Sequence, residues 1–479
     1  MRKLSIALVS LFLITSCVDS LDDYNIEQKR PSSAPPETFF TAAMKLMSDL
    51  MATPNVNTNN FRLYVQHWAT TTYLQEPRYD LTSRIIPQNI WQTLYKDVIA
   101  DLRESKRLIN EDELIAADTR TTMLAQLEIM EVYAWGLLVN TFGNVPYSEA
   151  MDFENPVPVY DDAATIYSDI LERLDAAIGS IADGSTGFEA ADVLYDGDTD
   201  QWIKFGNSLK LKLAMIIADV DNGKAKQLVE EAAPNVFTSN ADNARFPYLN
   251  SPPNNNPLSA KLSPNFSTRQ DYVIASAITD KMNDLNDPRR ESYFTTVGGQ
   301  YKGGNYGFAN SYADFSHVSN MIIAPDFEAL LLDYSEVEFL LAEAVERGYS
   351  VPGSAEEHYN KAIEASIEYW GGSASDIADY LAQPEVNYAT AGSDFKEKIG
   401  NQKWLALYNR GMDAWTEWRR FDYPVLQPPS GGNAPVGLTI PTRIIYPINE
   451  QTLNGPNRDA AAASMGGDVA STKLFWDVE

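Results

Sequence analysis

The residues able to carry acid–base, nucleophilic or metal chemistry are few and widely spaced in this chain of 479 residues. The three histidines, His67, His317 and His358, lie far apart, and none belongs to an HExxH pair. The chain also lacks a GxSxG elbow, a Walker loop and a GxGxxG fingerprint. Isolated histidines are more often packing or surface residues than ligands. We therefore expect no metal centre, no cofactor and no enzymatic activity.

Acidic side chains are abundant, but their spacing does not define a site. Asp196, Asp198 and Asp200 imitate the start of an EF-hand loop. Gln201 then replaces the glycine needed at the sixth position, and Asn207 replaces the glutamate needed at the twelfth. The interpretation we favour is an acidic turn before a helix, with Asp200 as its N-cap. A cryptic pair of glycosidase carboxylates among the 66 Asp and Glu residues stays an open alternative.

The single cysteine, Cys17, is the one side chain whose position suggests a modification. Met1-Arg2-Lys3 is followed by an apolar run from Leu4 to Ile14, which is typical of a secretory signal and too short for a membrane span. The sequence ITSC that ends at Cys17 resembles the bacterial lipobox, in which the cysteine is lipidated and becomes the first mature residue. The sequence thus predicts a signal peptide over 1–16, a lipid on Cys17 and a polar, flexible tether over 17–36.

Composition excludes several classes of partner. The net charge is −29, so neither a phosphate backbone nor an anionic bilayer is an expected binding surface. One cysteine cannot form an intramolecular disulfide framework or a cysteine-based zinc cluster. The balance of 44% hydrophobic and 22% charged residues is typical of a soluble globular chain with a large core.

Aromatic residues in irregular segments are the best candidates for ligand contacts. The chain has 9 Trp, 25 Tyr and 19 Phe, whose flat rings can stack on sugars or peptide side chains while neighbouring amides bond hydroxyl groups. Packing against the body of the protein is the competing role for each ring. The predicted ligand-binding residues are Trp68, Tyr73, Tyr79, Tyr301, Asn305, Tyr306, Phe308 and Tyr312.

The elements that would position these residues are predominantly helices. Apolar residues recur at steps of three and four in 127–138, 202–216, 337–344 and 404–418. Trp404, Tyr408, Trp415 and Trp418 of the last set are expected in the core. Ala355, Tyr359 and Ala362 have the small–aromatic–small spacing of a tetratricopeptide helix.

The helical period is lost between about 235 and 325, where prolines, asparagines and the glycine-rich sequence 298–307 favour loops. A loop region of this length that is rich in Tyr and Phe indicates an ordered, functional insert. A short strand is expected at Ile444–Ile448. Because no linker divides the chain, we predict a single domain over 37–479.

A series of longer motifs resembles the SusD/RagB-like lipoproteins. FGNVPYSEA at 142–150 is similar to their helix-ending signature, and WIKFGNSLKLKLAM at 202–215 to their W-x-KF-x-NSL helix, with Lys212 in place of an arginine on its polar face. DPRRESYF at 287–294, DYSEVEFLLAEAVERG at 333–348 and YNKAIEASIEYW at 359–370 follow in the family's order. The strongest match is IGNQKWLALYNRGMDAWTEWRRFDYPVL at 399–426, before IPTRIIYP at 440–447 and GGDVASTKLFWD at 466–477.

The resemblance implies a mostly helical fold in which tetratricopeptide-like helix pairs form a scaffold and a loop-rich region packs on it to bind the ligand. It also implies an outer-membrane lipoprotein that faces the cell exterior, captures an oligosaccharide and delivers it to a SusC-like TonB-dependent transporter. An oligopeptide ligand is the main alternative. A helical scaffold without a nutrient ligand and a cryptic glycoside hydrolase are less favoured. The family motifs are mostly scaffold, so they do not identify the ligand.

Overall fold

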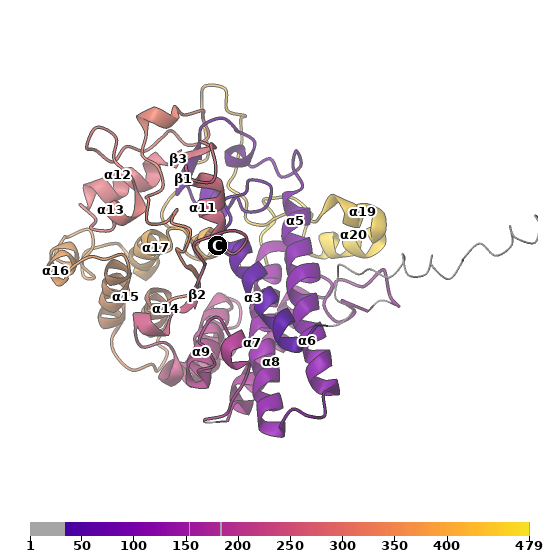
Figure 1. Cartoon of the computed structure of the whole chain (residues 1–479). Coiled ribbons are helices and arrows are strands. Elements are labelled where there is room, and N and C mark those ends of the chain that lie inside the picture. The colour runs from indigo at the N-terminus through magenta and orange to yellow at the C-terminus, as the bar shows by residue number, and fades with distance from the viewer. Residues whose placement is uncertain (1–33, 153, 183, 479) are drawn as a thin grey trace, which may run out of the picture.

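The computed structural model describes residues 34–152, 154–182 and 184–478. Cys17, the predicted signal peptide and most of the predicted tether lie outside these residues. Helices dominate the described chain (Figure 1). They are α3 (Pro36–Ala52), α4 (Phe61–Tyr64), α5 (Ile86–Gln92), α6 (Ala100–Glu111), α7 (Ala117–Phe142), α8 (Ala163–Ser180), α9 (Thr199–Ile216), α10 (Asn222–Ala232), α11 (Pro257–Leu262), α12 (Ser276–Asp284), α13 (Arg290–Tyr293), α14 (Tyr334–Glu346), α15 (Ala355–Tyr369), α16 (Ala374–Leu381), α17 (Phe395–Ala406), α18 (Gly411–Phe421), α19 (Ile448–Leu453) and α20 (Gly455–Ser464).

Two small antiparallel sheets join segments that are far apart in the sequence. Strand β1 (Trp68–Thr70) pairs with β3 (Tyr272–Ile274), and β2 (Ala244–Phe246) pairs with β4 (Ala329–Leu332). A π-helical stretch, η2 (Thr93–Ile99), joins α5 to α6, and one turn of 3-10 helix, η1 (Glu76–Arg78), lies between β1 and α5. Figure 1 shows β1, β3 and α11 together in its upper part, above the long helices α3, α6, α7 and α8.

Acidic and hydroxyl side chains begin many of the helices, but the expected cap of α9 is wrong by two residues. Asp198, not Asp200, is the N-cap, because its Oδ1 accepts hydrogen bonds from the amides of Asp200 (3.0 Å) and Gln201 (3.2 Å). Asp200 lies in the first turn, where its charge still favours the positive end of the helix. Equivalent side-chain caps are Asp162, Asp221, Asp333, Ser354, Ser373 and Asp394.

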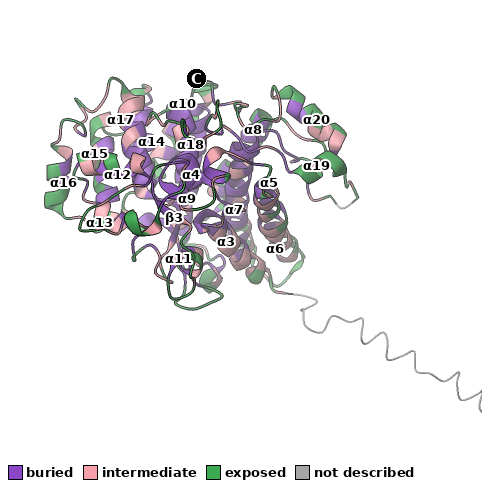
Figure 2. Cartoon of the chain, turned by 90° about the horizontal axis from the view of Figure 1, so that it is seen from above, coloured by how far each residue is buried: buried purple, intermediate pink, exposed green. Residues whose placement is uncertain are grey.

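Successive helices pack in pairs, as the periodicity predicts: α7 on α8, α9 on α10, α14 on α15 and α17 on α18. One hydrophobic cluster runs through these pairs from Phe40 to Trp476. Figure 2 shows the buried helices α4, α9 and α18 in the middle and the more exposed α16, α19 and α20 at the edges. The mostly helical fold class is thereby confirmed, whereas the tetratricopeptide geometry and the single domain stay predictions.

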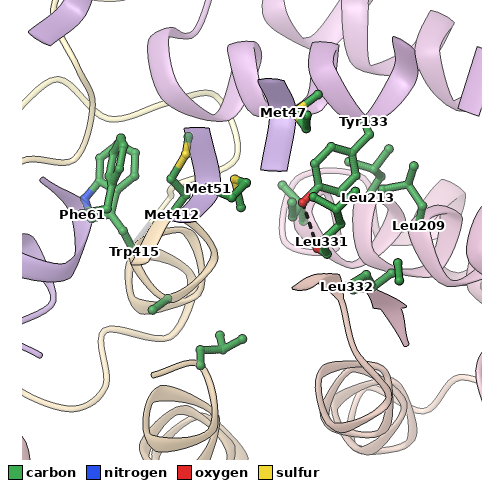
Figure 3. Close-up of a cluster of buried hydrophobic side chains, with 14 of the residues drawn as sticks. Met47, Met51, Phe61, Tyr133, Leu209, Leu213, Leu331, Leu332, Met412 and Trp415 are labelled. Atoms are coloured by element: carbon green, nitrogen blue, oxygen red, sulfur yellow. Dashed lines mark hydrogen bonds between the residues drawn. The ribbon is translucent and has the colours of Figure 1, made fainter. Parts of the chain in front are cut away.

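Helix α7 lies at the centre of the core. It is the one described helix that is long and apolar enough to cross a membrane, but 83% of its most apolar window is buried inside the protein. Its Tyr133 hydroxyl donates to the Leu331 carbonyl of β4 (2.8 Å), beside Leu209 and Leu213 of α9 (Figure 3). Burial of this kind is expected for a core helix of a folded chain.

A buried network of ion pairs joins α9, α14 and α18. Lys212 Nζ lies 2.5 Å from Asp413 Oδ1 and 3.0 Å from Glu336 Oε1, and Arg410 Nη2 lies 2.6 Å from Glu336 Oε2. Burial opposes ionisation of Glu336, but Lys212 and Arg410 outweigh it and lower its pKa. The expectation that Lys212 lies on a polar face is therefore wrong, because it is a buried cation that ties three helices together.

One further expectation needs correction. The predicted strand at Ile444–Ile448 does not form: the segment is irregular, Ile444 donates its amide to the Thr141 carbonyl, and α19 begins at Ile448. The loop-rich region 235–325 contains the short helices α11, α12 and α13 as well as β2 and β3. Trp404, Tyr408 and Trp415 are buried in the core as expected, while Trp418 is only partly buried.

Candidate functional site

A polar cavity of about 220 Å³ opens where three irregular segments meet. The first two segments follow α3 and β1, and the third runs from the end of α11 to the start of β3, so they come from widely separated parts of the chain. Ligand pockets often span roughly 300–1,000 Å³, so this cavity is suited to about one ring-sized group. The lining residues are Pro54, Asn55, Val56, Asn57, Tyr73, Arg84, Lys261, Leu262, Arg269, Asp271 and Tyr272.

The pairing of β1 with β3 brings two walls of the cavity together. Thr70 is opposite Tyr272 in the ladder, and the Thr71 amide continues it by donating to the Asp271 carbonyl (3.0 Å). The Thr71 hydroxyl also donates to the Gln270 carbonyl (2.6 Å). These bonds fix the start of the Tyr73 segment directly beside the end of the Arg269 segment.

The wall after α3 is shaped by asparagine turns. Pro54 follows the helix and cannot extend it, and the Asn57 amide donates to Asn55 Oδ1 (3.1 Å). The Asn57 carbonyl accepts from Asn89 Nδ2 (2.6 Å) of α5, and the Tyr272 hydroxyl donates to the Pro54 carbonyl (2.7 Å). Asn55 and Asn57 therefore present side-chain amides to the cavity, and hydrogen bonds from Asn89 and Tyr272 hold the backbone that carries them.

Arg84 is held at the cavity by a buried carboxylate. Its Nε donates to Oε1 of Glu76, a residue only 1% exposed, and its Nη1 donates to Asn57 Oδ1 (3.3 Å). The guanidinium carbon lies 5.1 Å from the centroid of the Tyr73 ring, which is a cation–π arrangement. One cation thus orders both the asparagine wall and the aromatic side chain.

The tip of the loop between Tyr73 and Arg84 is closed by Asp80. Its carboxylate accepts from the amides of Thr82 (2.9 Å) and Ser83 (3.0 Å) and from both hydroxyl groups. Partial burial opposes ionisation, but the hydrogen bonds from Ser83 and Thr82 lower the pKa of Asp80 to about 2. Asp80 is therefore ionised throughout the neutral pH range, and its carboxylate continues to accept these hydrogen bonds.

The wall after α11 carries the other two cations. Arg269 Nε donates to Asp271 Oδ2 (2.6 Å), and this bond raises the pKa of Arg269. Lys261 is exposed on α11 and makes no ion pair with any of the described residues. On the other side of this wall, a crevice of about 20 Å³ is lined by Tyr312 and His317.

The predicted ligand-binding residues are divided between this cavity and its surroundings. Tyr73 lines the cavity and is 37% exposed. Tyr312 lines the neighbouring crevice, where its ring stacks on His317 with the centroids 3.7 Å apart. Tyr301 lies elsewhere, half-buried beneath the Arg290 guanidinium at 5.4 Å.

Three predicted residues form a second cluster across η1 from the cavity. Arg78 donates through Nε to the Gly307 carbonyl (2.9 Å), and its guanidinium lies 5.6 Å from the Phe308 ring centroid. Asn305 is exposed in the same loop. Tyr79 follows η1, and burial raises its pKa to about 12. Because Glu76 and Arg78 both belong to η1, this one turn connects the cluster to the cavity.

Trp68 and Tyr306 are packed inside the protein. Trp68 is 1% exposed, donates Nε1 to the Tyr408 hydroxyl (3.1 Å) and lies 5.0 Å from the Arg62 guanidinium. Tyr306 is 6% exposed, and burial raises its pKa well above the usual value. In this conformation the two rings support the loops from beneath. Ligand contact by any of the eight predicted residues stays a prediction.

The prediction missed the polar residues that organise these loops. Asn310 is buried, donates to the carbonyls of Thr70 (2.9 Å) and Phe308 (2.8 Å), and accepts from the Asn305 amide (2.8 Å). Arg84, Lys261 and Arg269 were missed because aromatic content was the signal used. These three residues could have been identified as cations that cluster in loop regions of a chain that is otherwise acidic.

None of the three histidines lines the Tyr73 cavity, and His317 lines the neighbouring crevice with Tyr312. His67 is fully buried, with Nε2 3.1 Å from the Trp404 carbonyl. His358 lies between Glu338 (2.6 Å) and the Pro352 carbonyl (2.6 Å). Within the described parts of the chain, no group of three or more His, Cys, Asp or Glu side chains could hold a metal ion.

Comparison with known proteins gives one family and many similar structures. The model of the family described as "SusD-like_2: Starch-binding associating with outer membrane" matches residues 28–447. No curated protein matches the chain.

Three solved structures illustrate the structural likeness. A chitin-binding protein has a TM-score of 0.79 and 27% identity, covering 93% of this chain and 100% of its own. A chitin-binding SusD homolog from Flavobacterium johnsoniae has a TM-score of 0.78 and 25% identity, covering 93% and 99%. A SusD homolog from Bacteroides thetaiotaomicron has a TM-score of 0.77 and 23% identity, covering 93% and 100%.

Proposed function

Since this chain belongs to the SusD-like family, we propose that it is an outer-membrane lipoprotein that captures oligosaccharides at the cell surface. The observation that supports this proposal best is the polar cavity at Tyr73, in which an exposed ring, side-chain amides and guanidinium groups face the same space. The family's starch-binding description and the chitin-binding relatives at 27% and 25% identity favour a sugar ligand.

The chemistry of the cavity suits a saccharide. A sugar has a polar edge of hydroxyl groups and less polar ring faces, so it needs both hydrogen-bonding groups and a flat apolar surface. Tyr73 supplies the surface, while Asn55 and Asn57 supply amides that can donate and accept. Because Arg84 and the strand ladder hold these groups in place, binding would cost little ordering of the loops.

The predicted ligand-binding residues outside the cavity would either extend the binding surface or support the loops that form it. Tyr312 would extend the binding surface on the far side of Arg269, and Asn305 and Phe308 would contact chain units beyond η1. Trp68, Tyr306 and Tyr79 would set the loop positions, and Tyr301 would support the loop at Arg290. An oligopeptide remains the alternative ligand, since rings and amides also bind peptides.

A binding role is favoured over catalysis by the charge arrangement. Glycoside hydrolysis ordinarily uses two carboxyl groups, about 5–9.5 Å apart, on either side of the bond. Asp271 is the sole carboxylate among the residues that line the cavity, and it is engaged by Arg269. Delivery of the captured ligand would then fall to a partner, which we propose is a SusC-like TonB-dependent transporter, with the lipid on Cys17 keeping the protein at the membrane.

Titration of the protein from residue 18 onward tests the proposal. Tryptophan fluorescence or calorimetry would be followed while oligosaccharide and oligopeptide libraries are added. We expect saturable oligosaccharide binding, weakened by about 1–3 kcal/mol in Tyr73→Ala, because a stacking ring is removed. Leu114→Ala, at a residue 94% exposed in the α6–α7 connection, is the control. Silence across both libraries would refute the proposal, and binding of peptides alone would favour the alternative.

Association with the transporter needs its own experiment. The wild-type lipoprotein would be purified from membranes in mild detergent, and co-purifying barrel proteins would be identified by mass spectrometry. A TonB-dependent transporter in stoichiometric amount is expected. Recovery of the lipoprotein alone under conditions that preserve other outer-membrane complexes would contradict this part of the proposal. An intact complex with no binding of sugar or peptide would favour the scaffold alternative.

A further inference from the structure

Positive charge is concentrated around the cavity, in contrast to the chain as a whole. The net charge of the chain is −29, yet Arg84, Lys261 and Arg269 line the cavity against one carboxylate, Asp271. Glu76 lies behind Arg84 and neutralises it from the protein side. Arg269 is likewise paired with Asp271, so the excess positive charge that faces the cavity is that of Lys261.

Both arginines leave terminal nitrogens available. Each uses Nε to contact its carboxylate, Arg84 toward Glu76 and Arg269 toward Asp271. Among the described residues, Arg84 Nη2 and both Nη atoms of Arg269 make no hydrogen bond. A guanidinium oriented through Nε can still offer its terminal N–H groups to an anion, and the planar fork matches a carboxylate or a sulfate.

Lys261 adds a mobile charge to these oriented groups. It is exposed on α11 and is not ion-paired within the described chain. An ammonium on a flexible stem can reach an anion without a fixed geometry. The cavity thus combines an oriented fork at Arg269 and an adaptable point charge at Lys261 with the Tyr73 ring and two amides.

We propose that the cavity selects acidic oligosaccharides, meaning chains whose sugar units carry a carboxylate or a sulfate. Arg269 and Lys261 bind the anionic substituent, Arg84 contributes Nη2, and Tyr73 with Asn55 and Asn57 binds the ring. This inference rests on the proposed function and narrows its ligand class. A neutral glycan would leave the Lys261 charge and the terminal nitrogens of the two arginines without an anionic partner, whereas an acidic glycan supplies one.

The overall negative charge of the protein does not prevent this selection. Charges are screened beyond about 8 Å at physiological ionic strength, so the groups that line the cavity dominate the interaction with a bound anion. The distant acidic surface reduces the association rate of an anion but not the pairing within the cavity. Affinity should accordingly fall as salt is raised, because exposed ion pairs weaken with screening.

The test compares matched ligands on the full mature chain. Calorimetry at low salt would measure tetragalacturonate, a sulfated galactan tetrasaccharide, a neutral galactan tetrasaccharide and tetraglutamate. We expect the two acidic saccharides to bind about tenfold more tightly than the neutral one. Lys261→Gln and Arg269→Gln should each remove about fivefold to tenfold of the acidic affinity, as for loss of a charge-assisted hydrogen bond, and should lower the neutral affinity by a smaller factor.

Lys361→Gln, which removes an exposed charge from α15, is the control and should change no affinity. Unchanged melting temperatures would show that the variants fold. Equal binding of neutral and acidic saccharides, with no effect of the two cavity variants, would overturn the inference while leaving the proposed function intact. Tetraglutamate binding as tightly as the acidic saccharides would overturn the restriction to sugars. Failure of these saccharides together with silence across the oligosaccharide and oligopeptide libraries would refute the proposed function itself.

Discussion

The guanidinium carbon of Arg84 lies 5.1 Å from the centroid of the Tyr73 ring, while Nε of the same arginine donates to buried Glu76. One side chain therefore couples an interior carboxylate to an exposed aromatic ring. Packing alone does not hold the Tyr73 ring, which is 37% exposed, so the contact with the Arg84 guanidinium helps to fix its orientation. The orientation of Tyr73 thus depends, through Arg84, on Glu76, which is only 1% exposed.

Glu76→Gln should destabilise the protein and loosen Tyr73. The substitution replaces the ion pair with Arg84 by a hydrogen bond to a neutral acceptor and buries an amide NH₂ group where Glu76 Oε2 has no hydrogen-bond partner. We expect a loss of about 1–3 kcal/mol in the free energy of unfolding, measured by urea denaturation. Glu113→Gln, an exposed carboxylate between α6 and α7, should change it little. Equal stability of the two variants would contradict the role of Glu76.

Gly307→Ala should cost more stability than Gly348→Ala. Both glycines have φ of +78°, so both substitutions incur the left-handed backbone penalty of about 1–2 kcal/mol. A Cβ at Gly307 would lie 2.2 Å from Pro429 Cγ, whereas a Cβ at Gly348 would meet nothing within 4 Å. We expect an additional loss of about 1–3 kcal/mol for Gly307→Ala in thermal or urea unfolding. If the two variants lose the same stability, the loop 305–310 does not pack on Pro429 as described.

His67 should make the protein sensitive to mild acid. Burial lowers its pKa to about 3, although the hydrogen bond to the Trp404 carbonyl opposes the shift. The unfolded chain takes up a proton near pH 6.5 and the folded chain does not, so stability falls as pH decreases from about 6.5 toward 3. The slope from this group is about 1.4 kcal/mol per pH unit.

His67→Gln should flatten the acid limb of the stability curve even if it lowers stability at neutral pH. The measurement is the free energy of unfolding at several pH values between 7 and 5. An acid limb of unchanged slope would show that His67 is protonated in the folded state, and would contradict its neutral, buried form.

His358 should act with the opposite sign. Burial alone would lower its pKa, but the hydrogen bonds to Glu338 and to the Pro352 carbonyl outweigh burial and raise it. Because the folded protein binds this proton more tightly than the unfolded chain does, protonated His358 stabilises the fold. The stabilisation is complete below the pKa of the unfolded chain, about 6.5, and is lost as pH rises through the higher pKa of the folded protein. The melting temperature of His358→Gln should therefore differ from that of the wild type more at pH 6 than at pH 8. A difference that grows toward pH 8 would exclude a charged His358.

Cys17→Ala should release the protein from the membrane if the proposed lipid is the anchor. No other modification of this kind is available, because Cys17 is the single cysteine in the sequence. Fractionation and metabolic labelling with a fatty acid would measure attachment, and Ser16→Ala would serve as a control for processing. A variant that remains in the membrane fraction without a lipid label would disprove the anchor.

The sequence by itself determined the helical core and the family. Apolar residues at steps of three and four define buried helix faces, because only those positions share one side of a helix, and the observed pairs from α7 to α18 follow them. The motif series from 142–150 to 466–477 indicated the family, and its motifs at 202–215, 333–348, 359–370 and 399–426 fall mainly in helices α9, α14, α15, α17 and α18. Local patterns predicted the ends of elements less well. The N-cap of α9 is Asp198 and not Asp200, and the isolated apolar run at Ile444–Ile448 does not form a strand.

Tertiary structure alone decided the cavity. Its walls follow α3, β1 and α11, and the ladder that joins Thr70 to Tyr272 spans about 200 residues of sequence, so no local spacing encodes their proximity. Burial also separated the loop aromatics into exposed Tyr73 and enclosed Trp68, although the two lie five residues apart. Which loop side chains face solvent is set by the long-range contacts of the backbone, and those contacts exist only once the helices have packed.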